Sequence, residues 1–264
     1  MAALSLEERL EGRRNFSSHM RQAIDEETSP TSLLRHTVRS LVGSTCQRYH
    51  AAADTQVLPL FEYDCHDLWY IYLRFAKLTD VEDALMDSGV LSILTTRSLG
   101  TLVRQSATKD ELEVARTSDG LIWTDLPFFG KAIEGAWANK TLLSDRECKN
   151  LAGFCAKLLA VDVCVDGLVR CAVECFEEAF RAVGNETDNA SELQVAFVLV
   201  WLRYAGKKLF LIAKAGSLER SLDLDRWTMW KKKLEVLEEP NDEVKKWLSH
   251  MVWIESNMGF ARAG

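Results

Sequence analysis

Signals that begin helices recur along this chain, and proline, which breaks helices, is scarce. Ser5 with Glu8, and Ser144 with Glu147, have the spacing of a capping box, in which each side chain accepts a hydrogen bond from the other residue's backbone N–H. Ser29–Pro30 places a capping serine before a proline at the first helical position. Only four of the 264 residues are proline, and an interior proline removes a hydrogen bond from a helix. The sequence therefore predicts an all-α fold.

Apolar residues recur at helical spacing along most of the chain. A strand over Leu68–Leu73 (LWYIYL) is the one serious competing interpretation. Because the connections are short and no repeat of fixed period occurs, we expect roughly eight to ten helices in a single domain. That domain spans 1–264, with peripheral helices in 1–56 and a core over 60–255. The ranges predicted to be mainly helical are 125–138, 145–160, 165–183, 191–208, 226–238 and 242–256.

The eight tryptophans are the largest apolar side chains of the chain. Trp227 and Trp230 are one helical turn apart, so one face of a helix carries both rings. Trp201 lies in the most apolar predicted helix, which we expect to be central. Because an indole buries a large surface and needs a partner for its N–H, such residues form a core or line a pocket. Five are expected to be buried and to meet where the helix after Pro127 joins the final two helices: Trp123, Trp137, Trp201, Trp227 and Trp230.

The charge balance disfavours a nucleic-acid partner. The chain has 32 basic and 39 acidic side chains and a net charge of −7, whereas binding along a phosphate backbone needs a positive field. The basic run Lys231–Lys233 fits the solvated face of an amphipathic helix. The N-terminus lacks a signal or transit pattern, and the apolar run Val195–Leu202 is too short to span a membrane. We expect a cytoplasmic protein without a membrane span.

The seven cysteines are odd in number and widely scattered, so we expect reduced thiols. Cys164, Cys171 and Cys175 share one face of a predicted helix, where ligands a turn or more apart do not converge on zinc. Cys65 precedes His66, but the two flanking aspartates disfavour a reactive thiolate. The sequence therefore predicts no metal site and gives no cause for an activated cysteine.

Motifs that bind common cofactors are also missing. The sequence has no phosphate-binding glycine loop, dinucleotide fingerprint, serine-hydrolase elbow or C-x-x-C pair, so no cofactor is expected. Asp80, Asp83 and Asp87 lie at helical spacing, but a terpene cyclase would need a second magnesium-binding segment. We interpret them as a helix start capped by Asp80. Asp125 is likewise expected to cap a helix that Pro127 opens.

Four motifs, in their order and spacing, resemble a fungal family of all-helical proteins known only as a domain of unknown function. They are W-x-D-L-P before a helix ending in Trp, N-L-x-x-F-x-A, W-x-x-x-A-G and R-W-x-x-W. The resemblance covers about residues 60–255 and departs at 162–167, where the family usually has an aromatic residue. It implies a fungal origin and a helical fold, and it brings no catalytic assignment. Some members look to be encoded beside biosynthetic enzymes, which points to small-molecule metabolism. The matching residues are Trp123, Asp125, Leu126, Pro127, Trp137, Asn150, Leu151, Phe154, Ala156, Trp201, Ala205, Gly206, Arg226, Trp227 and Trp230.

Two functions are compatible with the sequence. The first is an accessory protein of fungal secondary metabolism that binds an apolar small molecule or a protein partner. The second is a cofactor-free enzyme, such as an isomerase, cyclase or dehydratase, with an apolar pocket and one or two polar groups from among Asp125, Arg203, Tyr204 and Arg226. Arg226 is expected to pair with Asp125 or Asp225. The predicted ligand-binding residues are Trp123, Asp125, Trp137, Trp201, Arg203, Arg226, Trp227 and Trp230.

Overall fold

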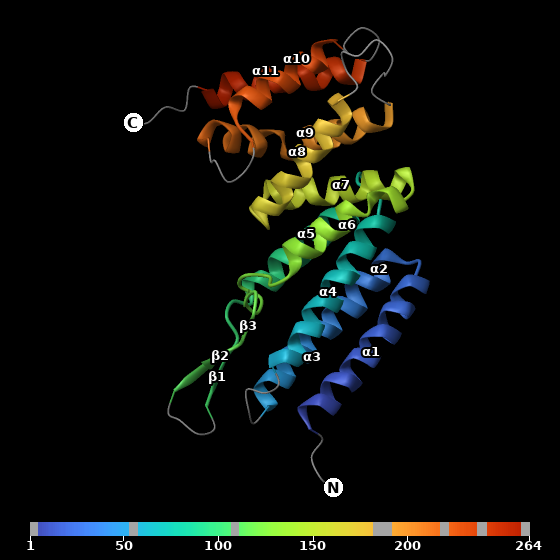
Figure 1. Ribbon diagram of the computed structural model, residues 1–264, viewed down its shortest axis with the longest axis vertical. Helices are drawn as coiled ribbons and strands as arrows, with labels where there is room; N and C mark the ends of the chain where they lie inside the picture. The colour runs from blue at the N-terminus through green and yellow to red at the C-terminus, as the bar shows by residue number, and fades with distance from the viewer. Residues whose placement is uncertain are drawn as a thin grey trace. The chain divides into compact units, whose positions relative to one another are not determined.

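The computed structural model describes residues 5–52, 58–106, 111–181, 192–216, 222–236 and 242–259. Helices predominate in these ranges, which confirms the all-α prediction (Figure 1). The chain divides into two compact units, Met1–Ala136 and Trp137–Gly264. Whether it forms the single predicted domain stays a prediction. Residues 182–183, 191 and 237–238, at the ends of three predicted helices, lie outside the described residues.

The first unit contains long helices whose beginnings follow the capping signals. Ser5 and Glu8 form the expected capping box, and Ser29 accepts a hydrogen bond from the N–H of Ser32. A π-helical segment, in which each turn holds more residues than an α-helical turn, connects two of the helices. The elements are α1 (Leu6–Glu26), α2 (Pro30–Ser32), the π-helical η1 (Leu33–Val38), α3 (Arg39–Ala51), α4 (Leu58–Leu78) and α5 (Ala84–Ser98).

Helix α4 is central to the first unit and packs against α1, η1, α3 and α5. Leu68, Trp69, Ile71 and Tyr72 are all fully buried. Because other helices cover α4 on several sides, its sequence contains a continuous apolar run, and such a run is also compatible with a buried strand. The stretch Leu68–Leu73 is helical.

The first unit also holds two short antiparallel hairpins in the stretch where helix signals are weak. In the first, β1 (Val103–Gln105) pairs with β2 (Leu112–Val114), and in the second, β3 (Arg116–Thr117) pairs with β4 (Gly120–Leu121). The Tyr49 hydroxyl of α3 donates to the carbonyl of Glu113 at 2.8 Å and so attaches the first hairpin to the helices.

The prediction that Asp125 caps the next helix was wrong. That helix, α6 (Phe129–Ala138), begins four residues after Asp125. Asp125 instead accepts a hydrogen bond from the N–H of Leu121 at 2.8 Å, and Asp119 accepts one from the N–H of Phe128 at 2.6 Å. Trp123, Leu126 and Phe128 have φ angles of 69°, 50° and 66°. These left-handed conformations rule out a continuous helix before Phe129.

Asp83, and not Asp80, caps α5. The Asp83 carboxylate accepts a hydrogen bond from the N–H of Leu85 at 2.8 Å, whereas Asp80 accepts one from the N–H of Glu82 at 3.0 Å in the preceding turn. Both residues have the right chemistry for a cap. The choice between them depends on where the backbone becomes helical, which the side chains alone do not specify.

The second unit is built around α9, which packs against α7, α8, α10 and α11. Trp201 lies on α9 and is fully buried, as expected for the central apolar helix. Ser144 and Glu147 form the second capping box at the start of α7. None of the helices in the described residues is long and apolar enough to cross a membrane. The elements are η3 (Lys140–Leu142), α7 (Asp145–Ala160), α8 (Val165–Arg181), α9 (Glu192–Ala215), α10 (Leu224–Val236) and α11 (Asp242–Gly259).

Candidate functional site

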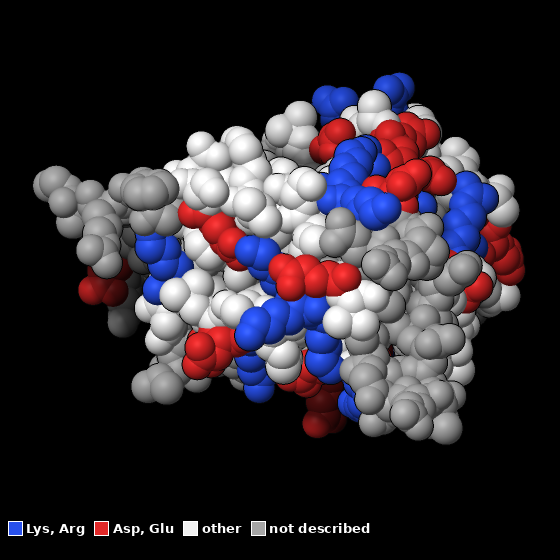
Figure 2. All heavy atoms as spheres, turned by 90° about the horizontal axis from the view of Figure 1, so that it is seen from above, with Lys and Arg blue, Asp and Glu red and all other residues white. Residues whose placement is uncertain are grey.

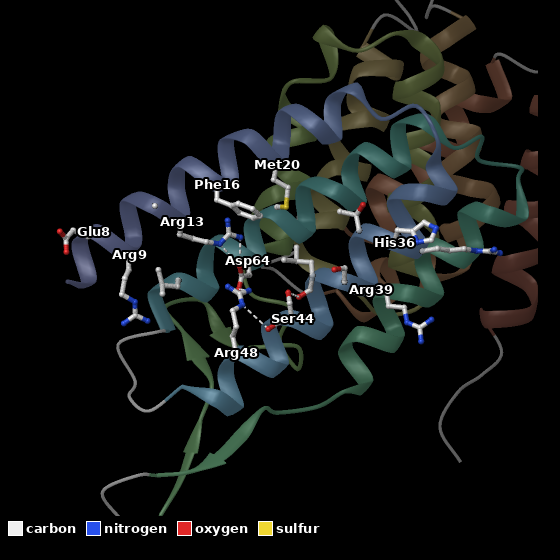
Figure 3. Close-up of a pocket in the computed structure, with 16 residues that line it drawn as sticks. Glu8, Arg9, Arg13, Phe16, Met20, His36, Arg39, Ser44, Arg48 and Asp64 are labelled. Carbon is white, nitrogen blue, oxygen red and sulfur yellow. Dashed lines mark hydrogen bonds and ion pairs between the residues drawn. The ribbon is translucent and has the colours of Figure 1, made fainter. Parts of the chain in front are cut away.

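A groove in the first unit gathers arginine side chains. It has a volume of about 1180 Å³ and lies between α1 on one side and η1 with α3 on the other, with α4 at its base (Figure 3). Five arginines and two carboxylates line it, although the chain as a whole is acidic. On the face shown in Figure 2, by contrast, basic and acidic side chains are interspersed. We call this feature the arginine groove; its lining residues are Glu8, Arg9, Gly12, Arg13, Phe16, Met20, Arg35, His36, Thr37, Arg39, Ser40, Leu41, Ser44, Arg48, Leu60 and Asp64.

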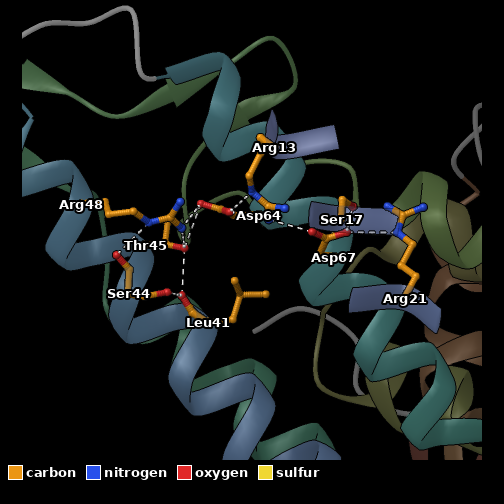
Figure 4. Close-up of polar contacts among 9 residues, drawn as sticks. All are labelled: Arg13, Ser17, Arg21, Leu41, Ser44, Thr45, Arg48, Asp64 and Asp67. Atoms are coloured by element: carbon orange, nitrogen blue, oxygen red, sulfur yellow. Dashed lines mark hydrogen bonds and ion pairs between the residues drawn. The ribbon is translucent and has the colours of Figure 1, made fainter. Parts of the chain in front are cut away.

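A buried ionic network forms the base of the groove (Figure 4). Arg13 lies between Asp64 and Asp67, both fully buried. Its Nε and Nη2 donate to Asp64 Oδ1 at 3.0 and 2.7 Å, and Nη2 also donates to Asp67 Oδ2 at 2.7 Å. Burial by itself lowers the pKa of Arg13, but the hydrogen bonds and charges of the two aspartates outweigh it and raise that pKa. Arg13 therefore stays charged.

Both aspartates have further partners. Asp64 Oδ2 accepts from Arg48 at 2.5 Å and from Thr45 at 3.2 Å. Asp67 Oδ1 accepts from Arg21 at 3.0 Å and from the Ser17 hydroxyl. Each carboxylate oxygen of the two aspartates thus accepts at least one hydrogen bond, and Asp64 accepts two on each oxygen. Their role is to hold arginines in place.

The rim of the groove carries cations without an acidic partner. Arg9, Arg35 and Arg39 make no side-chain hydrogen bond or ion pair within the described residues. Glu8 is occupied by the capping box, where its carboxylate accepts from Ser5. The Phe16 ring, 59% exposed, covers the guanidinium of Arg13 at 5.2 Å from ring centroid to guanidinium carbon. The groove thus combines positive charge with an exposed aromatic ring.

A second groove lies on the other side of η1 and α3, against α5. Its volume is about 1020 Å³, and six of its fifteen lining residues are leucine or valine. Arg35, His36 and Arg39 line this groove as well as the arginine groove. We call it the leucine groove; its lining residues are Leu34, Arg35, His36, Val38, Arg39, Val42, Gly43, Cys46, Leu85, Ser88, Leu91, Ser92, Thr95, Thr96 and Leu99.

The tryptophans predicted to be buried are buried. The exposed fraction is at most 2% for Trp123, Trp137, Trp201, Trp227 and Trp230. Within the second unit, the rings do not all contact one another as predicted. Trp137 contacts Trp201 edge-to-face, with ring centroids 6.1 Å apart. Trp227 contacts Phe210, and Trp230 contacts Phe176. Trp123 belongs to the first unit. Their role as ligand-binding residues stays a prediction.

Two of the polar residues proposed from the sequence, Arg203 and Arg226, have partners within the second unit. Arg226 pairs with Glu177 at 2.7 Å, not with Asp225. A pairing of Arg226 with Asp125 would join residues of different units and stays a prediction. The Arg203 guanidinium lies 5.2 Å from the ring centroid of Tyr204 on the exposed side of α9.

The seven cysteines all lie in the described residues, and none of them is part of a disulfide. Burial raises the pKa of the Cys65, Cys155 and Cys175 thiols, which opposes formation of a reactive thiolate. Within the described residues, no group of three or more metal-ligating side chains converges.

Comparison with known proteins places the chain in a family. Residues 69–234, more than half of the chain, match the family described as "Protein of unknown function (DUF3632)". The chain belongs to this family. The resemblance to a fungal family of unknown function is therefore confirmed. The matched segment begins after Asp67, so the base of the arginine groove precedes it.

A similar protein comes from Penicillium oxalicum and is named "Oxopyrrolidines biosynthesis cluster protein G". The two are 30% identical over 169 residues, which is 58% of this chain and 47% of that protein. The match thus spans about half the length of the relative. No solved structure matches the chain.

The sequence did not indicate the two grooves. Their residues come from five helical segments, α1, η1, α3, α4 and α5, and lie together only once these segments pack. One signal was present: Arg13, Ser17 and Arg21 repeat every four residues, and two aspartates three residues apart, Asp64 and Asp67, lie among the apolar residues of α4. Charged residues on a buried helix face require partners of opposite charge. That rule pairs α1 with α4.

Proposed function

We propose that this chain is a non-catalytic accessory protein of fungal secondary metabolism that binds a small amphipathic organic anion in the arginine groove. The observation that carries the proposal is the set of three rim arginines, Arg9, Arg35 and Arg39, which have no acidic partner in the described residues. An arginine guanidinium offers a planar fork of donors that matches a carboxylate.

The apolar part of such a ligand has a matching surface. Phe16 and Met20 on α1 face the groove together with Leu41 on α3 and Leu60 on α4. A concave site with apolar walls and a few placed charges is typical of small-molecule binding. An aromatic or unsaturated carboxylic acid fits this combination.

The buried network favours binding over catalysis. Asp64 lies at the base of the groove, but its oxygens are held by Arg13, Arg48 and Thr45. A general base must have a free lone pair within reach of the proton that it abstracts. The network instead fixes Arg13 and Arg48 before a ligand arrives, which lowers the entropic cost of binding.

The metabolic context is proposed by analogy with the relative. The Penicillium oxalicum protein is named for an oxopyrrolidine biosynthesis cluster. The sequence similarity to that protein supports a role for this chain beside biosynthetic enzymes. The groove supports a ligand that is one of the products or precursors of those enzymes.

Calorimetric titration with naphthalene-2-carboxylate, and with naphthalene-2-methanol as the uncharged analogue, tests the binding. We expect the acid to bind at least about tenfold more tightly than the alcohol, which corresponds to about 1.4 kcal/mol. Arg9→Gln removes a cation that lines only this groove and should weaken binding of the acid alone. Gly12→Trp should abolish binding of both, because a Cβ at Gly12 meets no atom within 4 Å and points into open space.

Gly43→Trp is the matched control, since Gly43 lines only the leucine groove and its Cβ also meets no atom within 4 Å. Equal binding of acid and alcohol, or loss of binding in Gly43→Trp but not in Gly12→Trp, contradicts the proposal. Metabolite profiling of a deletion strain then names the ligand. If the purified protein converts the accumulated metabolite, the chain is a cofactor-free enzyme and the accessory role is wrong.

A further inference from the structure

We propose that the leucine groove is a second ligand site, which takes an unbranched aliphatic carboxylate with its charged end at Arg35 and Arg39. The proposal concerns a ligand class and a surface different from those of the arginine groove. It rests on the chemistry of the groove walls, on the two shared arginines and on the exposure of the leucines.

The walls of this groove are more apolar than their residue types indicate. The hydroxyls of Ser88, Thr95 and Thr96 donate to backbone carbonyls one turn earlier in α5, at 3.3, 2.8 and 3.0 Å. Ser92 and Tyr72 share a hydrogen bond at 2.8 Å. Because these hydroxyls already have partners, they give a ligand little to recognise along its length. A chain of methylene groups suits such walls.

The apolar side chains are left open to solvent. Leu91 is 62% exposed and Leu99 is 49% exposed. Covering them removes apolar surface from water, which stabilises a complex in proportion to the area buried. On the opposite wall, Leu34 and Val38 of η1 are themselves buried, so a ligand would mainly cover Leu91 and Leu99.

The positions of Arg35 and Arg39 indicate where the charged end of the ligand would bind. Arg35 and Arg39 are four residues apart, so they lie one turn apart on adjoining parts of η1 and α3. Both are exposed and make no side-chain hydrogen bond or ion pair within the described residues. Arg35 and Arg39 are the two arginines among the described residues that line the leucine groove, and none of these residues is an aspartate or glutamate. An apolar chain with one anionic end matches this distribution.

Dodecanoate, below its micelle concentration, is the probe, and dodecanol is its uncharged counterpart. Calorimetric titration should show dodecanoate binding at least about tenfold more tightly than dodecanol. Changing both Arg35→Gln and Arg39→Gln should remove that difference and leave dodecanol binding unchanged. Gly43→Trp should abolish binding of both probes, whereas Gly12→Trp and Arg9→Gln should leave both unchanged.

Leu91→Glu provides a second variant if Gly43→Trp does not fold. The side chain is mostly exposed, so the fold tolerates the change, and the new carboxylate in the groove should repel dodecanoate and weaken its binding at least tenfold. The proposal is overturned if Gly12→Trp abolishes dodecanoate binding while Gly43→Trp does not, or if dodecanoate and dodecanol bind alike. Because naphthalene-2-carboxylate reports on the arginine groove through Arg9 and Gly12, either proposal can fail while the other holds.

Discussion

Replacing Arg13 with methionine should destabilise the first unit more than replacing either of the other two arginines in the ionic network. Methionine retains the apolar stem of the side chain and removes only the guanidinium. The change deletes three N–H···O bonds of 2.7–3.0 Å to two fully buried carboxylates. Removing one partner of a buried ion pair typically costs 3–5 kcal/mol. Since Asp64 and Asp67 keep other donors, we expect about 3 kcal/mol.

Arg48→Met is the matched control. Arg48 also binds Asp64, but its side chain is 45% exposed and solvent screens the interaction. Asp64 keeps Arg13 and Thr45 in this variant. We therefore expect a loss of about 1 kcal/mol or less, in the range of exposed ion pairs.

Amide hydrogen exchange along α4 is the suitable assay, because it reports the opening free energy of the first unit separately from that of the second. Amides near Asp64 should exchange roughly a hundredfold faster in Arg13→Met than in the unchanged protein, which corresponds to about 3 kcal/mol. Equal exchange rates in the two variants would refute the assignment of Arg13 as the central cation of the network.

Further predictions concern single positions. Gly12→Ala should raise the free energy of unfolding by about 0.5–1 kcal/mol, because it restricts the unfolded chain and its Cβ meets no atom within 4 Å; a lower urea midpoint contradicts this. Trp230→Ala should cost about 3–5 kcal/mol, and an unchanged melting temperature would show that the ring is not core. Iodoacetamide should label Cys46 and Cys164 first in the native protein, since the other thiols are buried; mass spectrometry of peptides checks the order. Burial, aided by a nearby arginine, lowers the pKa of His66 below 6.5. Protonation therefore favours the unfolded chain, so stability should fall as pH drops below about 6.5, and less so in His66→Gln, as urea midpoints at several pH values will show.

Local signals in the sequence were enough for most of the fold. The capping boxes at Ser5 and Ser144 depend on residues three apart, and both form as predicted. The burial of Trp201 follows from the apolarity of its own helix. Asp125 was misjudged because three left-handed residues lie close to it in the sequence. Contacts with more distant residues hold this segment: the Phe128 N–H donates to Asp119, and the Trp69 indole N–H donates to the carbonyl of Pro127.

The grooves were not predictable in the same way. Arg13 and Asp64 are far apart in the sequence, and the flanking of Cys65 by acids indicated only that its thiolate was disfavoured. Which tryptophan meets which ring also depends on how α8, α9 and α10 pack. Pairings between distant segments require the fold first, because many arrangements satisfy the same local pattern.

The π-helical segment η1 has a consequence for insertions and deletions. An α-helix turns by roughly 100° per residue, and a π-turn accommodates extra residues within a helix that otherwise keeps its axis. Deleting one residue from η1 would let it continue as an ordinary α-helix whose two sides keep nearly the same facing, because the wider turn already absorbs that residue. A one-residue deletion in α3 before Thr45 would instead rotate the rest of the helix by about 100°. Thr45 and Arg48 hold Asp64 from α3, so a deletion there should break the ionic network, whereas the same deletion in η1 should leave it in place.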